Sequence, residues 1–110
     1  MEKRDLLEEG IIFFNQGRYY EAHEVWEDLW RETRGPLKGF YQGLIHAAVG
    51  LHHLKKDNLA GAASQIQKSI RRLTGYSGSD QPVDSFTLVR QLSEVLTDLR
   101  PEVIRIVRSN

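Results

Sequence analysis

The stretch "FNQGRYYEAHEVWEDLW", residues 14–30, decides the fold because it contains a complete helix–turn–helix pattern. Gly17 follows a helical spacing of apolar residues and therefore ends a first helix over about residues 3–16. A second helix over about residues 18–33 begins directly after this glycine. Its apolar side chains fall on one arc and predict the buried face, which consists of Tyr19, Ala22, Trp26, Leu29 and Trp30.

The same pattern returns forty residues later in "LKKDNLAGAASQIQKSI", residues 54–70. It predicts a third helix that begins near Pro36 and ends at about Lys56, and a fourth that ends at about Leu73. Each hairpin of this kind cannot bury its apolar face alone and must stack on a neighbour. The G-x-Y-x-x-A turn resembles a tetratricopeptide hairpin, although the repeat expected there is only about 34 residues long. Two unrelated helical hairpins of similar length would align about as well, so the sequence leaves open whether the repeat is genuine.

The C-terminal part predicts a loop followed by a fifth helix. Glycine and serine without apolar periodicity indicate the loop over residues 74–82. Asp84 or Ser85 can cap the fifth helix, and Pro101 ends or restarts it. Residues 102–108 are left open between a short helix and an extended tail. The face of the fifth helix that we expect to be buried consists of Phe86, Val89, Leu92, Leu96 and Leu99.

The composition fits a single soluble domain, and we expect residues 1–110 to form one all-α bundle of five or six helices. This bundle would consist of two antiparallel, tetratricopeptide-like hairpins plus a C-terminal helix. The chain carries 15 Lys+Arg and 15 Asp+Glu, so its formal net charge is zero and binding to the phosphate backbone of nucleic acids is not favoured. The absence of cysteine excludes disulfides, thiol nucleophiles and cysteine metal sites.

Neither a signal peptide nor a membrane span is predicted. The N-terminal "MEKRDLLEEG" lacks an apolar signal core. The longest run without a charged residue, residues 39–54, is shorter than the roughly 20 residues that span a bilayer. We therefore expect a cytoplasmic protein that binds neither a membrane nor a nucleic acid.

The third helix carries a stripe of small residues on one side: Gly39, Gly43, Ala47 and Gly50. A glycine inside a helix costs about 1 kcal/mol relative to alanine, so the stripe indicates the close approach of another helix. That helix can belong to the same chain or to a second copy. A 110-residue domain has little interior in which to cover a helix on every side, so we expect a homo-oligomer that uses this stripe.

Five polar residues form the candidate site: His23, Glu24, Glu27, Gln42 and His46. On a helical wheel His23 and Glu27 border the apolar arc of the second helix, whereas Glu24 is more exposed. Gln42 and His46 lie on the largely buried third helix and need hydrogen-bond partners there. We favour an internal network in which His23 and Glu27 bond to Gln42 or His46. A catalytic or ligand site, and a metal site formed by His23, Glu27 and His46, remain open as alternatives.

The known catalytic and metal signatures fit this cluster poorly. The H-E-x-x-H pattern of zinc proteases needs a second histidine where Glu27 stands. Di-iron carboxylate bundles need carboxylates on four helices, and the third helix has none. No P-loop or G-x-S-x-G pattern is present. We therefore expect no tightly bound metal and no cofactor, and we interpret Lys68, Arg71 and Arg72 as a solvated face of the fourth helix.

Two segments, "FNQGRYYEAHEVWEDLWR" and "YQGLIHAAVGLHHLKKDNLAGA", resemble the small helical proteins grouped as domain of unknown function family 309. The resemblance runs from about Phe14 to Leu73 and rests on the "EAHEVWE" and "QGLI" motifs. It implies an all-helical bundle without an assigned activity. The polar positions that it marks map onto Glu21, His23, Glu24, Glu27 and Gln42, and His46 is not among them.

Two functions are consistent with these observations. The favoured one is a non-enzymatic helical module for self-association or partner binding. The alternative is a small hydrolase or metal-dependent enzyme that uses His23, Glu24 and Glu27. An open pocket lined by His23, Glu27 and His46 would favour the enzyme, whereas a closed and mutually bonded cluster would favour the module.

Overall fold

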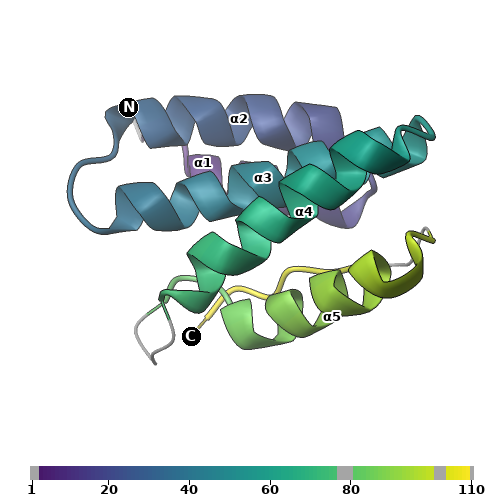
Figure 1. Ribbon diagram of the computed structural model, residues 1–110. Helices are drawn as coiled ribbons and strands as arrows, with labels where there is room; N and C mark the ends of the chain where they lie inside the picture. Colours follow the sequence, from purple (N-terminus) through teal and green to yellow (C-terminus); the bar gives the residue numbers. More distant parts are fainter. Residues whose placement is uncertain (1–2, 77–80, 101–103, 110) are drawn as a thin grey trace.

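The computed structural model of the protein describes residues 3–76, 81–100 and 104–109. Five helices follow one another along this part of the chain, and each packs against the next (Figure 1). The prediction of an all-α bundle made of two hairpins plus a C-terminal helix is therefore confirmed. The helices are α1 Leu6–Asn15, α2 Tyr19–Glu32, α3 Leu37–Lys55, α4 Leu59–Thr74 and α5 Ser85–Asp98.

The turns of the two hairpins have the same backbone geometry, as the forty-residue repeat predicts. Gly17 and Asp57 occupy equivalent positions, and both have a left-handed φ, of 76° and 61°. In each turn the amide of this residue donates to the carbonyl three residues earlier, at 2.9 and 3.1 Å. The next amide donates to the carbonyl five residues earlier, at 2.9 and 2.8 Å. The repeat in the sequence is therefore a repeat in the backbone.

Large apolar side chains at equivalent positions of the two hairpins fill the core. Trp26 of α2 and Ile66 of α4 are both fully buried. Gly10 gives Trp26 the space to lie against α1, because any side chain at that position would overlap the indole. The indole Nε1 also donates to the carbonyl oxygen of Leu7, at 3.3 Å. Tight packing of α1 against α2 thus depends on one glycine and one tryptophan.

The stripe of small residues on α3 packs against α4 of the same chain. A Cβ added at Gly43 would come within 2.8 Å of Leu73 Cδ2, and one added at Gly50 within 2.7 Å of Ile66 Cγ1. The buried Ser69 hydroxyl also donates to the Gly43 carbonyl oxygen, at 2.7 Å. Our expectation that this stripe contacts a second copy is corrected, because α4 already covers it. Self-association through another surface stays a prediction.

The buried face of α5 differs from the one predicted. Phe86 is 81% exposed, whereas Leu88, Leu92 and Val95 are fully buried. The apolar residues of α5 fall on two overlapping stripes, and packing selects the stripe that meets α4 and the C-terminal tail. Asp84 caps the helix, since its side chain accepts from the amide of Thr87 at 3.1 Å.

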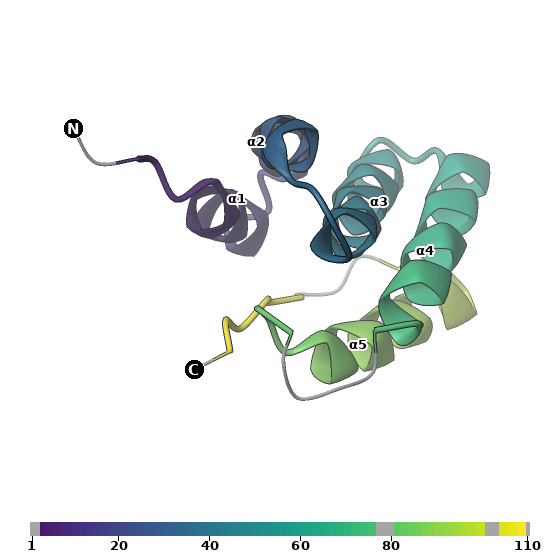
Figure 2. The same cartoon turned by 90° about the vertical axis from the view of Figure 1, so that its left-hand side faces the viewer.

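Residues 104–109 form an extended tail and not a short helix, the two alternatives that the sequence left open for this segment. Pro101 lies outside the described residues. The tail passes beneath α3 from the α5 side toward α1 and closes the curved row of helices (Figure 2). Both backbone polar groups of Ile106 bond to the Asn15 side chain of α1, at 3.0 and 2.8 Å. Val83 and Arg108 form an isolated antiparallel bridge. Among the helices of the described residues, we found none with the length and apolar character of a membrane span.

Candidate functional site

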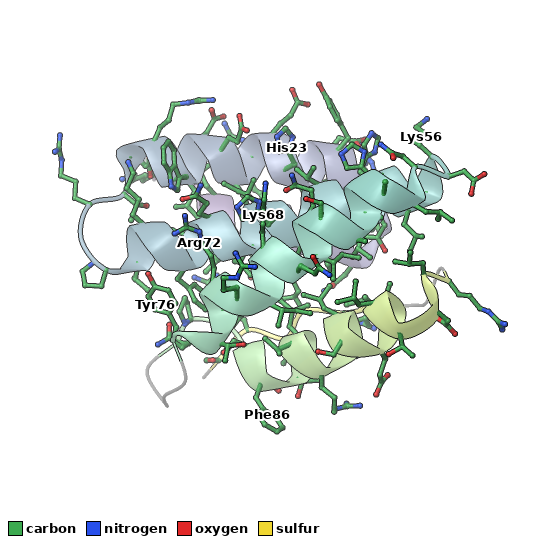
Figure 3. The ribbon with its side chains drawn as sticks, viewed as in Figure 1. His23, Lys56, Lys68, Arg72, Tyr76 and Phe86 are labelled. Carbon is green, nitrogen blue, oxygen red and sulfur yellow. The ribbon has the colours of Figure 1, made fainter. Side chains whose placement is uncertain are left out.

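A hollow of about 390 Å³ lies where α2, α3 and α4 meet, and we call it the polar hollow. Four of the five predicted site residues line it, from two different helices. Glu24 does not, because it is exposed on another side of α2. Figure 3 shows His23 on α2 and Lys68 on α4, to either side of α3. The lining of the polar hollow consists of His23, Glu27, Trp30, Arg31, Gln42, Ile45, His46, Val49 and Gln65.

His23 and Glu27 bond to each other and not to α3. His23 Nε2 lies 2.9 Å from Glu27 Oε1, one helical turn further along α2. The prediction that their partners are Gln42 or His46 is wrong, because the i,i+4 spacing already brings the two side chains together. Their side chains are 23% and 44% exposed, so the His23 ring is largely out of water, as predicted, while the carboxylate is not.

His46 also finds a partner that the sequence did not suggest. Its Nδ1 lies 2.7 Å from Oε1 of Gln65 on α4. An amide oxygen can only accept, so this contact keeps the proton on Nδ1 and leaves Nε2 as an acceptor in the neutral ring. Burial lowers the pKa of His46 below its usual value, and the nearby charges of Arg72 and Lys68 lower it further, against the opposing effect of the Gln65 hydrogen bond. The neutral imidazole is therefore favoured.

Gln42 lies on the floor of the polar hollow with both of its polar atoms available. Its side chain makes no hydrogen bond to any group that the structure describes. The His23–Glu27 pair lies within α2 and the His46–Gln65 pair joins α3 to α4, and no hydrogen bond among the described residues joins one pair to the other. The polar hollow is the open pocket that the sequence analysis associated with an enzyme, and not the closed cluster.

Three neighbouring hollows continue the polar hollow along α3. His46 also lines a hollow of about 460 Å³, which we call the basic hollow. His23 and Val49 also line a hollow of about 210 Å³ with Tyr20, His52 and His53. Tyr20 and His52 in turn line a hollow of about 290 Å³ near Lys56. The four hollows therefore follow one another along the half-buried stripe of α3, and we call this row of hollows the trough.

Sequence reasoning missed the contribution of α4 to this trough. Gln65, Lys68 and Arg72 line it. Lys68 and Arg72 are exposed, in agreement with the predicted solvated face, but the sequence did not show that they border the trough. The spacing of Gln65, Lys68 and Arg72, of three and four residues, places them on one side of a helix.

The chemistry available in the polar hollow is hydrogen bonding and charge. Its lining includes two imidazoles, two amides, one carboxylate and the guanidinium of Arg31, which pairs with that carboxylate, but no hydroxyl or thiol that could act as a nucleophile. In the part of the chain that the structure describes, no group of three or more His, Asp or Glu side chains is placed to hold a metal ion. The residues present therefore fit ligand binding better than covalent or metal-assisted chemistry.

The match to a known sequence family extends over the helices that build this trough. Residues 7–65 match the family described as Domain of unknown function (DUF309), which covers 59 of the 110 residues. The chain belongs to this family. The resemblance seen in the sequence is thus confirmed, and the match contains His23, Glu27, Gln42, His46 and Gln65.

Two curated relatives of the chain are described as uncharacterised proteins. An uncharacterised protein of Aquifex aeolicus (strain VF5) is 29% identical over 93 residues, which cover 84% of this chain and 28% of that protein. The uncharacterised protein YpuF of Bacillus subtilis (strain 168) is 39% identical over 65 residues, or 57% of this chain and 37% of that protein. The chain thus matches only about a third of the length of each relative.

Proposed function

We propose that this chain is a non-enzymatic binding module and that its ligand occupies the polar hollow. The observation that carries the proposal is the separation of the two bonded pairs. His23–Glu27 lies on α2, and His46–Gln65 joins α3 to α4, with open space between them. Side chains that only fixed the helix packing would bond across this space and close it.

The volume and lining of the hollow support a small polar ligand. Pockets of roughly 300–1,000 Å³ are typical of small-molecule sites, and this hollow falls in that range. Gln42 offers an amide donor and acceptor, and Glu27 has lone pairs beyond its bond to His23. Ile45 and Val49 supply apolar surface on the floor. A ligand would therefore find both hydrogen-bonding partners and an apolar contact.

A catalytic function has less support. A histidine bonded to a carboxylate is the arrangement of a general base, but a base needs a nucleophile to activate or a substrate proton to remove. The lining residues supply no side-chain nucleophile next to His23. The hollow can therefore accommodate a ligand, but its lining does not indicate a reaction. Binding is the simplest function for such a site.

The test is a set of proton–nitrogen correlation spectra of the full chain with a library of small polar fragments. The library should contain anionic, cationic and neutral members. We expect several fragments to shift the amide and side-chain signals of Gln42, His46 and Gln65 in a saturable manner. Signals of α5, which lines none of the hollows of the trough, provide the internal control. If fragments shift α5 as often as the polar hollow, the proposal is wrong.

A further inference from the structure

The basic hollow gathers three cations beside the polar hollow. It has a volume of about 460 Å³ and is lined by His46, Lys68, Arg71, Arg72 and Tyr76. Lys68 and Arg72 follow one another along α4, and Tyr76 comes just after the end of this helix (Figure 3). The spacing of four residues places Lys68 and Arg72 one turn apart on the same helical face. The cations thus converge on one space.

Close packing of α4 on α3 holds this arrangement in place. Without a side chain at Gly43, the helices approach so closely that an added Cβ would lie 3.3 Å from Arg72 Cβ. At the far end, the Tyr76 hydroxyl donates to the carbonyl oxygen of Pro36, at 2.8 Å. The Tyr76 ring also packs edge-on against the buried Phe40, with centroids 5.5 Å apart. The wall of the basic hollow is therefore fixed to the core at both ends.

Among the residues that the structure describes, no carboxylate pairs with these three cations. Lys68, Arg71 and Arg72 take part in no ion pair within the described residues, where most other arginines have an acidic partner. Neither α3 nor α4 contains an aspartate or glutamate. The positive charge of the basic hollow is thus available to an anion from solution.

The end of α4 explains only part of this charge. Cations are favoured in the last turn of a helix, where the carbonyl dipoles point outward, and Arg71 and Arg72 lie there. Lys68 stands six residues before the last residue of α4, which is almost two turns away. The dipole effect falls off within the last turn, so it gives no reason for a lysine at that position.

We propose that the basic hollow binds the phosphate group of a phosphorylated small molecule, the rest of which lies in the polar hollow. Two guanidinium forks and one ammonium match a dianion that carries several acceptor oxygens, whereas a single carboxylate would leave cations unpaired. His46 lines both hollows and so connects the phosphate site to the space for the rest of the ligand. The proposal rests on the binding function proposed above for the polar hollow.

A small molecule fits the trough better than a nucleic acid does. A protein that follows a phosphate backbone carries a basic stripe and a net positive charge, but this chain has 15 basic and 15 acidic residues. In the adjoining hollow Glu27 is paired with Arg31, at 3.6 Å, so the charges there are balanced and offer no free cation to a second phosphate, while the carboxylate can still accept a hydrogen bond from a hydroxyl group. The site thus favours one phosphate joined to a neutral, hydroxyl-bearing part.

The test is a titration of the full chain with three probes: glucose 6-phosphate, inorganic phosphate and unphosphorylated glucose. Proton–nitrogen spectra report the backbone amides and the arginine Nε signals, and the pKa of His46 is followed by its ring protons. We expect saturable shifts at Lys68, Arg71 and Arg72, with glucose 6-phosphate binding more tightly than inorganic phosphate and glucose not binding. The pKa of His46 should rise when the anion is bound, because the phosphate offsets the charges that lower it.

The decisive variant is Arg72→Gln, with Arg90→Gln on α5 as its control. Both remove one positive charge from an exposed helical position, but Arg90 lines none of the hollows. We expect Arg72→Gln to weaken glucose 6-phosphate binding about tenfold, and Arg90→Gln to weaken it less than about twofold because salt screens distant charges. Circular dichroism establishes that both variants are folded.

Three outcomes would overturn this proposal. They are no saturable shift with either phosphate, equal losses in the two variants, and inorganic phosphate binding as tightly as glucose 6-phosphate. Neutral or cationic fragments that bind in the polar hollow while glucose 6-phosphate fails would contradict the phosphate site alone. The binding function proposed above would then stand.

Discussion

Trp26 and His23 stand three residues apart on α2, yet their surroundings differ. Trp26 is fully buried and its indole donates to the Leu7 carbonyl oxygen of α1. The His23 side chain is 23% exposed and bonds only to Glu27, whose own side chain is 44% exposed. An ion pair or hydrogen bond with this much exposure to solvent contributes well under 1 kcal/mol to stability, or about 0.3–0.5 kcal/mol for an i,i+4 pair.

Replacing the site pair on α2 should therefore change stability little. We expect His23→Ala and Glu27→Ala to lower the free energy of unfolding by less than about 1 kcal/mol each. Trp26→Ala should lower it by about 3–5 kcal/mol, since it leaves a cavity in the core. Urea melts give the comparison, with Glu24→Ala on the exposed side of α2 as a matched control. A loss above about 2 kcal/mol for either site variant would restore the structural interpretation made from the sequence.

His46 makes stability depend on pH in a defined direction. Its pKa is lowered mainly by burial, and the pKa of His52 is lowered for the same reason. Between the lowered value and the usual value near 6.5, the unfolded chain binds more protons than the folded one. The free energy of unfolding should therefore fall as the pH is lowered from 7 to about 5.

The measurement is the urea midpoint of wild type and His46→Gln across this pH range. We expect the urea midpoint to fall less in the variant, because it lacks one of the two histidines whose pKa is lowered, His46 and His52. The carboxylates with lowered pKa values, such as Asp84, titrate at lower pH and contribute little here. A midpoint that rises on acidification, or the same fall in both proteins, would contradict the assigned direction.

At the scale of helices, the contact between α3 and α4 depends on the absence of side chains. A Cβ at Gly50 would lie 2.7 Å from Ile66 Cγ1 and 3.1 Å from the Ile66 backbone nitrogen. Backbone cannot move aside as a flexible side chain does. Gly50→Ala should thus destabilise the protein by about 1–3 kcal/mol, although alanine is the better helix former.

Gly75→Ala is the matched control for this prediction. Gly75 follows α4 with a φ of −66°, which any residue adopts, and an added Cβ would come no closer than 3.4 Å to another atom. We expect this variant to keep or raise the free energy of unfolding, by up to about 1 kcal/mol. Thermal melts of both variants test the pair. Equal stability of Gly50→Ala and Gly75→Ala would show that α4 does not press on α3 at Gly50.

The helices and their contacts also show which features of the fold and of the candidate site can be predicted from the sequence. The turns at Gly17 and Asp57 were predictable because local spacing and turn chemistry determine them. The buried face of α5 was not predictable, because Phe86 and Leu88 belong to two different apolar stripes. Packing against the neighbouring elements determines which stripe is buried. The hydrogen-bond partner of His46 was also not predictable, because Gln65 lies on α4 and helical periodicity does not give the relative register of two helices. Four residues that line the polar hollow were predicted from α2 and α3, but Gln65 of α4 and the pairing of the side chains were not.

At the scale of the whole molecule, the C-terminal tail joins the two ends of the row of helices. Asn15→Ala would remove both hydrogen bonds that α1 makes to the backbone of Ile106, a residue that is only 2% exposed. Buried polar groups without partners cost about 1–3 kcal/mol, so we expect a loss of that size. Arg108→Ala removes exposed ion pairs to Asp5 and Glu8 and should cost less than about 1 kcal/mol. If urea melts rank the two variants in the opposite order, the tail is held by charge and not by Asn15.

The trough along α3 is the central feature of this account, and Val49→Trp tests it most directly. Val49 lines both the polar hollow and the neighbouring hollow of about 210 Å³ that includes His52 and His53, and it is only partly buried. A tryptophan there would occupy the trough without entering the core, so the free energy of unfolding should stay within about 1 kcal/mol of wild type. The measurement is the set of saturable shifts that polar fragments cause at Gln42 and His46 in the two proteins. We predict that these shifts are present in wild type and abolished in the filled variant, whereas unchanged shifts in a folded Val49→Trp protein would contradict the trough as the binding site.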